Sequence, residues 1–433
     1  MRKVAVYTLG CKVNQVESES IKQSFLRKGY QVVDIEEQAD VYVINTCTVT
    51  HVSDRKSRAM LRRVRRKNPG AVVVATGCFA EISPQSLAGM PEVDIILGNR
   101  EKERVADIVG QYQPGGRPLV MVGGERPGLS SSPDIIPAAR ERTRAFVKIE
   151  DGCESYCSYC IVPYTRGPVR SKSPEDVCEE IRHLVEAGYR EVVLTGIHTG
   201  MYGRDLDGWD LSRLLHKLLD SVEGDYRLRL SSLEPVEVSD ELVALLEKDR
   251  RLCRHLHIPL QSGSDRILRL MNRRYTRDLY RSLLQELAGR IPGLALTADV
   301  MVGFPTETEE DFRETLELVE ELPFYDLHVF PYSRRPGTGA YHLSPQVDPR
   351  LKEQRSRVLL SLARQKKAIF INRLLGQTLM VLVEERVDDC DYEGLTDNYV
   401  RVVFPGEEGM KGSLVPVTLE RHCGHSARGV VAR

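Results

Sequence analysis

Residues 144–160 read RAFVKIEDGCESYCSYC, a short strand pattern that leads directly into three closely spaced cysteines. Cys153, Cys157 and Cys160 have the spacing Cys-x3-Cys-x2-Cys. Three thiolates on one loop can hold three irons of a 4Fe-4S cluster and leave the fourth iron open. A zinc knuckle and three incidental thiols are the alternatives, but structural zinc takes four ligands and no histidine lies within twenty residues of the loop. The spacing therefore favours the cluster.

The sequence beyond this loop alternates strand and helix patterns as far as about residue 330, followed by a long helical pattern over 351–375. About six such units predict a central partial TIM-type (β/α)6 barrel over residues 143–370. Catalytic groups of such barrels lie at the carboxyl ends of the strands.

The first 112 residues have the same rhythm, which predicts an N-terminal parallel α/β domain of the flavodoxin-like kind. Cys11, Cys47 and Cys78 each fall just past one of its predicted strands, in VAVYTLGC, VYVINTC and VVVATGC. Any one of them alone is more typical of a core thiol. Because the carboxyl ends of parallel strands share one edge of the sheet, the three thiols are expected to converge on a second open cluster.

Two further segments complete the α/β organisation. Residues 113–142 are rich in Pro, Gly and Ser, which predicts a linker. Residues 371–433 change to a period of two and predict a small antiparallel β-barrel. Cys178, Cys253, Cys390 and Cys423 lack ligand spacing, and the run from His422 to His425 offers only three zinc ligands.

Composition excludes several classes of protein. The chain has 433 residues, of which 41% are hydrophobic and 28% charged, and no apolar run approaches the length of a membrane span. Ten cysteines are too few for a disulfide scaffold of this size, and the amino terminus lacks the pattern of a signal peptide. We expect a cytoplasmic protein. With 61 basic and 62 acidic residues, a nucleic-acid partner must be argued locally.

Together, the six cysteines and their surroundings resemble the radical S-adenosylmethionine (SAM) enzymes of the methylthiotransferase family, over nearly the whole chain. The opening YTLGCKVNQVESE is similar to the branch that acts on threonylcarbamoyladenosine in tRNA. The isopentenyladenosine branch more usually has Gln-Met after the first cysteine, and the ribosomal-protein branch has Pro-Lys, where this chain has Lys12-Val13-Asn14. Further matching stretches are CSYCIVPYTRGPVRS, TGIHTGMYGRD, LHIPLQSGSDRIL, LMNRRYT and DVMVGFPTETEEDF.

The resemblance implies two 4Fe-4S clusters and two uses of SAM. The cluster on Cys153, Cys157 and Cys160 would cleave SAM to a radical that abstracts hydrogen from carbon 2 of adenine. The cluster on Cys11, Cys47 and Cys78 would carry sulfur, and a second SAM would donate the methyl group. The carboxyl-terminal barrel would be a TRAM domain. The implied partners are tRNA and an electron donor such as a flavodoxin or ferredoxin, with the chain acting as a monomer.

The resemblance also implies a set of SAM contacts at the strand ends of the barrel and on the cysteine loop. They are Tyr159, Thr195, Gly196, Ser231, Glu234, Gln261 and Gly303. Each has a structural alternative: the glycines can be turn formers, Glu234 a solvated charge, and Tyr159 a packing residue of the loop.

Two cationic helical segments predict contact with RNA. Eight cations and no acid occur from Arg55 to Lys67, with a narrow apolar stripe between them. From Arg350 to Arg373 eight cations face one acid, a local charge of +7. The expected RNA contacts are Arg55, Arg58, Arg62, Arg63, Arg66, Lys366 and Lys367. Residues 377–433 carry ten acids and six Lys or Arg, so the tail either touches RNA with one face or mainly shapes the mouth of the cavity.

Three functions remain open at this point. The first is methylthio transfer to threonylcarbamoyladenosine at position 37 of tRNA. The second keeps the chemistry and changes the substrate to isopentenyladenosine tRNA or a ribosomal protein. The third is a non-catalytic iron-sulfur module that binds RNA.

Overall fold

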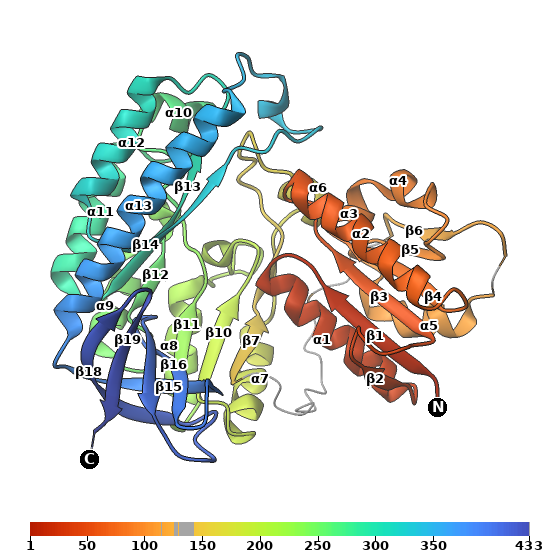
Figure 1. The fold of residues 1–433 in the computed structure, drawn as a ribbon, viewed down its shortest axis with the longest axis horizontal. Coiled ribbons are helices and arrows are strands. Elements are labelled where there is room, and N and C mark those ends of the chain that lie inside the picture. Colours follow the sequence, from red (N-terminus) through yellow and green to blue (C-terminus); the bar gives the residue numbers. More distant parts are fainter. Residues whose placement is uncertain (114, 125–128, 130–142, 433) are drawn as a thin grey trace. The chain divides into compact units, whose positions relative to one another are not determined.

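The computed structural model describes residues 1–113, 115–124, 129 and 143–432 (Figure 1). The chain forms two compact units. Unit 1 holds the described residues of Met1–Ala138, together with Glu150–Lys172 and Ser333–Tyr341. Unit 2 holds the described residues of Ala139–Ile149, together with Ser173–Tyr332 and His342–Arg433. The loop with Cys153, Cys157 and Cys160 therefore belongs to unit 1, with the other three candidate ligands.

Unit 1 is built on a six-stranded sheet of order β2-β1-β3-β4-β5-β6, in which every pairing is parallel. Its strands are β1 (Lys3–Thr8), β2 (Gln31–Val33), β3 (Val41–Thr46), β4 (Val72–Gly77), β5 (Ile95–Leu97) and β6 (Leu119–Met121). Its helices are α1 (Lys12–Arg27), α2 (His51–Lys67), α3 (Cys78–Ile82), α4 (Pro84–Ala88), α5 (Val105–Gln111) and the 3-10 turn η1 (Lys102–Arg104). The flavodoxin-like prediction is confirmed.

Burial on both faces explains the apolar strands of this sheet. All six residues of β3 are buried, as expected of a parallel strand covered by helices on both sides. One apolar cluster includes Leu61 and Val64 of α2, and the other includes Ile21 and Phe25 of α1. Helix α2 begins where the side chain of Thr50 accepts a hydrogen bond from the backbone of Ser53.

The predicted linker over 113–142 needs a correction. Residues Leu119–Met121 form β6, which pairs with β5 at the edge of the sheet. Three residues between Gly- and Pro-rich flanks give too short a periodic signal to be recognised as a strand. Most of the rest of this segment lies outside the described residues.

The later segments of unit 1 are short. Strands β8 (Glu150–Asp151) and β9 (Arg170–Ser171) form an antiparallel pair that encloses the cysteine loop and α6 (Val162–Arg166).

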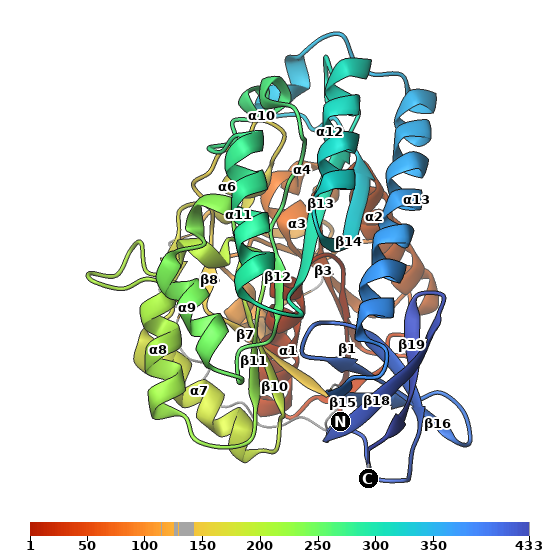
Figure 2. The ribbon, with the colours of Figure 1, turned by 90° about the vertical axis from the view of Figure 1, so that its left-hand side faces the viewer.

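Unit 2 contains the predicted partial barrel as six parallel strands in two hydrogen-bonded groups (Figure 2). They are β7 (Arg144–Lys148), β10 (Glu191–Thr195), β11 (Arg227–Leu230), β12 (His255–His257), β13 (Ala295–Val302) and β14 (Phe324–Pro331). The α-helices that accompany them are α7 (Pro174–Glu186), α8 (Leu211–Ser221), α9 (Asp240–Lys248), α10 (Asp265–Leu270), α11 (Arg277–Arg290), α12 (Glu309–Glu321) and α13 (Pro349–Leu374). The short 3-10 helices are η2 (Thr199–Met201), η3 (Pro235–Glu237) and η4 (Gly339–His342), the last of which runs from unit 1 into unit 2. Within the described part of the chain, no helix has the length and apolar character needed to cross a membrane.

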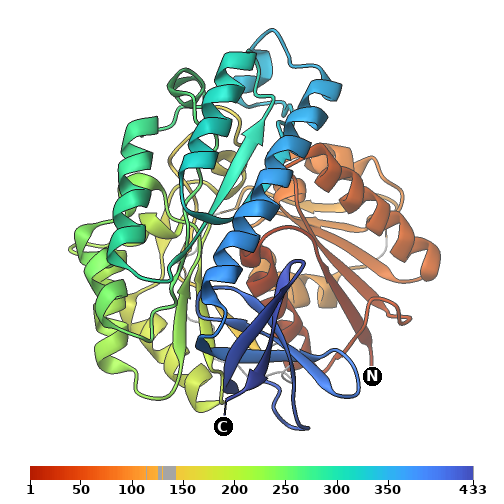
Figure 3. The ribbon, with the colours of Figure 1, turned by 60° about the vertical axis from the view of Figure 1, so that its left-hand side comes forward.

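The tail forms a closed five-stranded barrel of order β15-β16-β17-β19-β18, visible in dark blue in Figure 3. Its strands are β15 (Thr378–Arg386), β16 (Asp391–Thr396), β17 (Arg401–Pro405), β18 (Leu414–Cys423) and β19 (Ser426–Val431). The antiparallel prediction is wrong for one pair, because β17 and β19 run parallel. An odd number of strands cannot close a ring with every neighbour antiparallel.

The small barrel packs against the amino ends of the strands of unit 2. Arg227, the first residue of β11, donates hydrogen bonds to the carbonyl oxygens of Met380 (3.0 Å) and Leu395 (2.8 Å). His255, the first residue of β12, stacks on Tyr399 with ring centroids 4.6 Å apart. The interpretation that this tail shapes the cavity mouth is therefore not supported, because that mouth was expected at the carboxyl ends.

Candidate functional site

Cys11, Cys47 and Cys78 follow β1, β3 and β4, which are neighbours in the sheet. Thr46 of β3 pairs with Gly77 of β4, so the residues that follow them, Cys47 and Cys78, lie at corresponding positions on the same edge of the sheet. Gly10 lies so close to Cys47 that a Cβ on it would be 3.0 Å from the thiol sulfur, and its φ of +102° suits glycine. Both Cys78 and Cys11 act electrostatically on the Cys47 thiol, so the three cysteines are neighbours at this edge, and their ligation of a cluster stays a prediction.

The environment of these thiols is largely closed. Cys47 and Cys78 are buried, whereas Cys11 is exposed. Burial raises the pKa of the Cys47 thiol, and the neighbouring Cys78 and Cys11 raise it further. A bound metal would reverse this effect, because metal ligation stabilises the thiolate.

Arg166 places a buried positive charge beside the three thiols. Its guanidinium is 1% exposed and pairs with Glu17, which also accepts from Lys102. A second nitrogen of Arg166 donates to the side-chain oxygen of Asn14 (2.5 Å). Burial would lower the pKa of Arg166, but Cys78, Glu17, Asp151 and Cys11 together hold it well above its usual value.

This network connects the two groups of cysteines within unit 1. Arg166 ends α6, six residues after Cys160, and α6 is anchored by a hydrogen bond from the side chain of Asn99 to the carbonyl oxygen of Thr165 (2.9 Å). Asn14 also donates to the carbonyl oxygens of Leu9 (2.7 Å) and Thr46 (3.1 Å), just before two of the cysteines.

The loop with Cys153, Cys157 and Cys160 is closed by backbone hydrogen bonds. The amide of Cys153 donates to Gly167 (3.0 Å), and that of Cys160 donates to Cys157 (2.9 Å). All three cysteines are half-buried, as is Tyr159. These bonds hold the three cysteines on one short loop, and their role as ligands of an open cluster stays a prediction.

A third segment of unit 1 contacts both cysteine regions. The amide of Ala340 donates to the carbonyl oxygen of Ser158 (2.6 Å). Arg335 is buried and pairs with Asp54 (2.6 Å), beside Ser57, whose hydroxyl donates to the carbonyl oxygen of Cys47 (3.2 Å).

The predicted SAM contacts of unit 2 lie at the carboxyl ends of its strands. Thr195 ends β10 and Gly196 follows it, Ser231 follows β11, Gln261 lies beyond β12, and Gly303 follows β13. The Ser231 hydroxyl and the Gln261 side-chain oxygen are buried with no hydrogen-bond partner among the described residues. Buried polar atoms are almost always paired, so these two suit a polar ligand.

Glu234 and Gly303 have structural roles of their own. Glu234 caps η3 and pairs with Arg273 (2.5 Å). The amide of Gly303 donates to both oxygens of Glu307 (3.0 and 3.1 Å). Its φ is +69°, and a Cβ there would lie 2.3 Å from Cγ of Lys352, so only glycine fits without displacing that side chain.

Several cations of α2 form ion pairs within the protein. Arg63 pairs with Glu36 (2.5 Å), Arg62 with Glu92 (3.8 Å), and Arg65 with Asp94. Arg58 donates to Ser86 and lies over the ring of Phe79. The cations of this helix without an acidic partner within 4 Å among the described residues are Arg55, Lys56, Arg58 and Arg66.

Helix α13 likewise uses several of its cations internally. Lys366 donates to the carbonyl oxygens of Glu320 (2.5 Å) and Leu322 (2.7 Å), and its burial lowers its pKa. Lys367 pairs with Asp326 (2.8 Å). Both residues were predicted to contact RNA. Their side chains already bind to protein groups, Lys366 to carbonyl oxygens and Lys367 to a carboxylate, and the RNA contact stays a prediction.

The remaining cysteines fall outside these groups. Cys178 and Cys253 are buried, and burial raises the pKa of Cys253 to about 12. Cys390 and Cys423 are exposed. A ring nitrogen of His422 lies 2.7 Å from the carbonyl oxygen of Gly424, and the run to His425 forms no metal-like group among the described residues.

A flavodoxin-like sheet with three strand-end thiols, a second cysteine loop and a partial (β/α)6 barrel define an iron-sulfur protein of the radical SAM class. The sequence model of "Radical SAM superfamily" matches residues 147–319, and that of "Uncharacterized protein family UPF0004" matches residues 3–98. The solved structure of the radical S-adenosylmethionine methyltransferase TsrM from Kitasatospora setae shares the fold, with a TM-score of 0.57 and 16% identity over 79% of this chain and 75% of that chain.

Curated relatives cover nearly the full length. Threonylcarbamoyladenosine tRNA methylthiotransferase MtaB of Bacillus subtilis (strain 168) is 43% identical over 97% of this chain and 94% of its own length. MtaB of Aquifex aeolicus (strain VF5) is 40% identical over 96% of this chain and 100% of its own. tRNA-2-methylthio-N(6)-dimethylallyladenosine synthase of Desulfitobacterium hafniense (strain Y51) is 35% identical, over 97% and 95%. The chain belongs to the radical SAM methylthiotransferase family.

Sequence reasoning did not single out the polar and charged residues beside the thiols. Asn14 and Glu17 follow Cys11 by three and six residues, and Arg166 follows Cys160 by six. Their closeness to the cysteines was a usable signal. The pairing of Glu17 with Arg166, across 149 residues, was not predictable from local patterns.

Proposed function

We propose that this chain transfers a methylthio group to carbon 2 of threonylcarbamoyladenosine 37 in tRNA. The observation that carries the proposal is the presence in unit 1 of two trios of cysteines, with Arg166 and Asn14 beside the trio that follows the sheet strands. Two relatives named as threonylcarbamoyladenosine tRNA methylthiotransferases, 43% and 40% identical over 97% and 96% of this chain, support the choice of substrate.

The donor sets fit two open 4Fe-4S clusters. Cys153, Cys157 and Cys160 would hold one cluster and Cys11, Cys47 and Cys78 the other, each with three thiolates and one iron left open. When bound, they would supply reductive cleavage of SAM and a site for sulfur. A flavodoxin or ferredoxin is the proposed electron donor, and the proposed working form is a cytoplasmic monomer.

The charged residues of the chain prepare the site for these groups. Three thiolates place negative charge in a largely buried pocket, and Arg166 offsets it from within the same unit. Lys102 shares Glu17 with Arg166, and Arg166 also pairs with Asp151 (3.4 Å), so two cations and two carboxylates lie beside these thiols. Asn14 ties this network to the backbone before Cys47.

The proposed phosphate contacts are the cations of α2 and α13 whose side chains have no ion pair, hydrogen bond or ring contact among the described residues. On α2 these are Arg55, Lys56 and Arg66, and on α13 they are Arg350, Arg364 and Arg373. Such contacts give affinity that falls as salt rises, while recognition of the modified base belongs to the cavity.

The test combines cells and reconstituted protein. In a strain without this activity, the wild-type gene should restore 2-methylthio-threonylcarbamoyladenosine, measured by mass spectrometry of tRNA nucleosides. Cys47→Ala should abolish the product and retain SAM cleavage to 5′-deoxyadenosine in vitro. Cys157→Ala should abolish both, and Cys423→Ser should change neither.

Two outcomes would contradict the proposal. Restoration of methylthio-isopentenyladenosine alone would move the chain to the second substrate, as in the dimethylallyladenosine relatives. RNA binding without SAM cleavage by the wild type would favour a non-catalytic module.

A further inference from the structure

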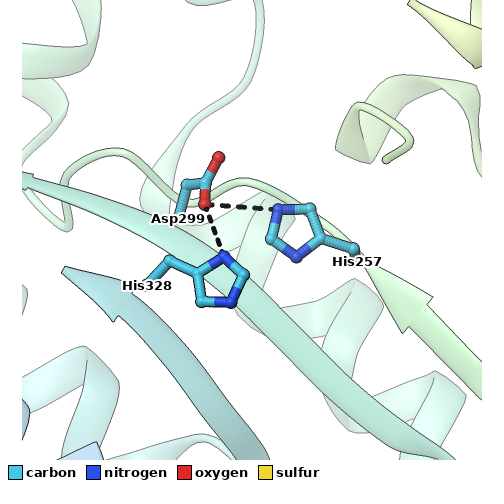
Figure 4. A group of neighbouring side chains, drawn as sticks. All are labelled: His257, Asp299 and His328. Carbon is cyan, nitrogen blue, oxygen red and sulfur yellow. Dashed lines mark ion pairs between the residues drawn. The ribbon is translucent and has the colours of Figure 1, made fainter. Parts of the chain in front are cut away.

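Three side chains from neighbouring strands meet on one face of the second strand group of unit 2 (Figure 4). They are His257 of β12, Asp299 of β13 and His328 of β14. Asp299 and His328 are directly paired in the register of these strands, and His257 pairs with Thr297, two residues before Asp299. The alternate residues Ala298 and Val300 are fully buried, so the three polar side chains share the opposite face of β13.

The distances are wide for hydrogen bonds and close to those of a metal site. Nε2 of His257 and Nδ1 of His328 each lie 3.4 Å from the same oxygen of Asp299. Hydrogen bonds between such atoms are about 2.7–3.2 Å long. Two ligands about 2.0–2.1 Å from a tetrahedral zinc lie about 3.3 Å apart. All three ligand atoms lie within 4.8 Å of one another.

A neighbouring hydroxyl orients one of the two imidazoles. Nδ1 of His257 is 3.0 Å from Oγ1 of Thr297, and Nε2 of His255 is 3.0 Å from the same oxygen. The Thr297 hydroxyl itself donates to the carbonyl oxygen of Leu256 (3.5 Å). If Nδ1 of His257 donates to Thr297, Nε2 of His257 keeps a lone pair directed at Asp299. Metal-binding histidines characteristically donate their second nitrogen in this way.

The site combines two half-buried side chains with one exposed side chain. The exposed fractions of the side chains are 15% for His257, 31% for Asp299 and 70% for His328. A cation can therefore enter from solvent and retain water or take a further ligand on its open side. Two imidazoles and one carboxylate suit cations of borderline softness, such as Zn²⁺, Co²⁺ or Fe²⁺.

We propose that His257, Asp299 and His328 bind one divalent transition-metal ion, separate from the six cysteines and with at least one position open. The site does not depend on the proposed substrate of the enzyme. The competing interpretation is an ion pair in which both histidines serve only the carboxylate.

The test is a Co²⁺ titration of the holoenzyme with both clusters in place, followed by the visible absorption of the ion and reversed by Zn²⁺. Wild type should bind one Co²⁺ without a thiolate charge-transfer band. Asp299→Ala and His328→Ala should weaken binding by more than about 100-fold, beyond the range of outer-shell changes. His216→Ala is the matched control, because His216 is an exposed histidine of the same unit that also pairs with a carboxylate, Glu241 (3.1 Å).

His328 keeps the test independent of folding, since its side chain is mostly exposed and its loss should leave the cluster absorption unchanged. Thr297→Val should weaken binding by about 10–100-fold while the band position is retained. Equal Co²⁺ affinity in wild type and His328→Ala would overturn the proposal. So would a thiolate charge-transfer band that is insensitive to Asp299→Ala, because the ion would then sit on cysteines.

Discussion

The buried arginine networks of the two units lie at opposite ends of their parallel strands and serve different purposes. In unit 1, Arg166 pairs with Glu17 at the carboxyl ends, beside three thiols. In unit 2, Arg227 and Arg229 share Glu191 at the amino ends (2.6 and 2.7 Å). The remaining donors of the second network go to backbone carbonyl oxygens of the small barrel. The network of Arg166 thus places a positive charge beside the thiols. The network of Arg227 and Arg229 joins the parallel strands of unit 2 to the small barrel.

The largest expected effect is that of Arg166→Met. Without the guanidinium, the pocket around Cys11 and Cys78 loses the cation that offsets its thiolates. We expect iron in the reconstituted protein to fall from roughly eight to roughly four atoms per chain. Arg65→Met is the control, because Arg65 pairs with Asp94 in the same unit, whereas Arg166 pairs with Glu17 and Asp151. Full iron content in Arg166→Met would refute the role given to this residue.

The second network predicts a loss of stability. Glu191→Gln leaves two buried arginines without their carboxylate, and breaking a buried pair costs about 3–5 kcal/mol. Urea unfolding should show this loss, with SAM cleavage per folded molecule retained. Glu186→Gln, an exposed position on α7, should leave the unfolding midpoint unchanged. A similar midpoint in both variants would show that the carbonyl oxygens suffice to hold the arginines.

The same carboxylate predicts how stability responds to acid. Burial would raise the pKa of Glu191, but Arg229 and Arg227 together hold it far below its usual value. A depressed pKa contributes stability above the unfolded value of about 4.3, which is lost progressively as the pH falls below it. Wild type should therefore lose stability below about pH 4 more steeply than Glu191→Gln. Parallel curves of unfolding free energy against pH would contradict this assignment.

A smaller effect on tRNA binding should distinguish the cations of α2 that have an acidic partner from those that have none among the described residues. Arg66 has no acidic partner among the described residues, whereas Arg63 pairs with Glu36. Removal of a phosphate contact lowers the salt slope of RNA binding by about 0.7–0.9. We expect that change in tRNA binding for Arg66→Ala and little change for Arg63→Ala. The reverse order would mean that the tRNA displaces Glu36 from Arg63.

The smallest expected effect is that of Cys423→Ser. Cys423 is exposed at the end of β18, and surface changes of this kind are usually within about 0.5 kcal/mol. Thermal unfolding and iron content should both match the wild type. A loss of iron would show that a seventh cysteine takes part in cluster assembly.

The sequence predicted those features that depend on local pattern and strand topology. The apolar run of β3 identified a buried strand, and the rule for parallel sheets brought Cys47 beside Cys78. Pairings between distant residues left no such signal. The acids that pair with the cations of α2, Glu36 and Asp94, lie in loops that are distant from α2 in the sequence. In the small barrel, β19 pairs with β17 only because the barrel closes.

Unit 1 is assembled from three separate stretches of the polypeptide, which has a consequence for synthesis on the ribosome. After Ala138 emerges, roughly 200 residues must follow before Ser333 appears, about 10–40 s at ordinary elongation rates. During that interval Arg335, with which Asp54 forms an ion pair in the folded protein, has not yet been synthesised. Unit 1 is therefore among the first parts of the chain to be translated, and it is completed only after most of unit 2 has been made.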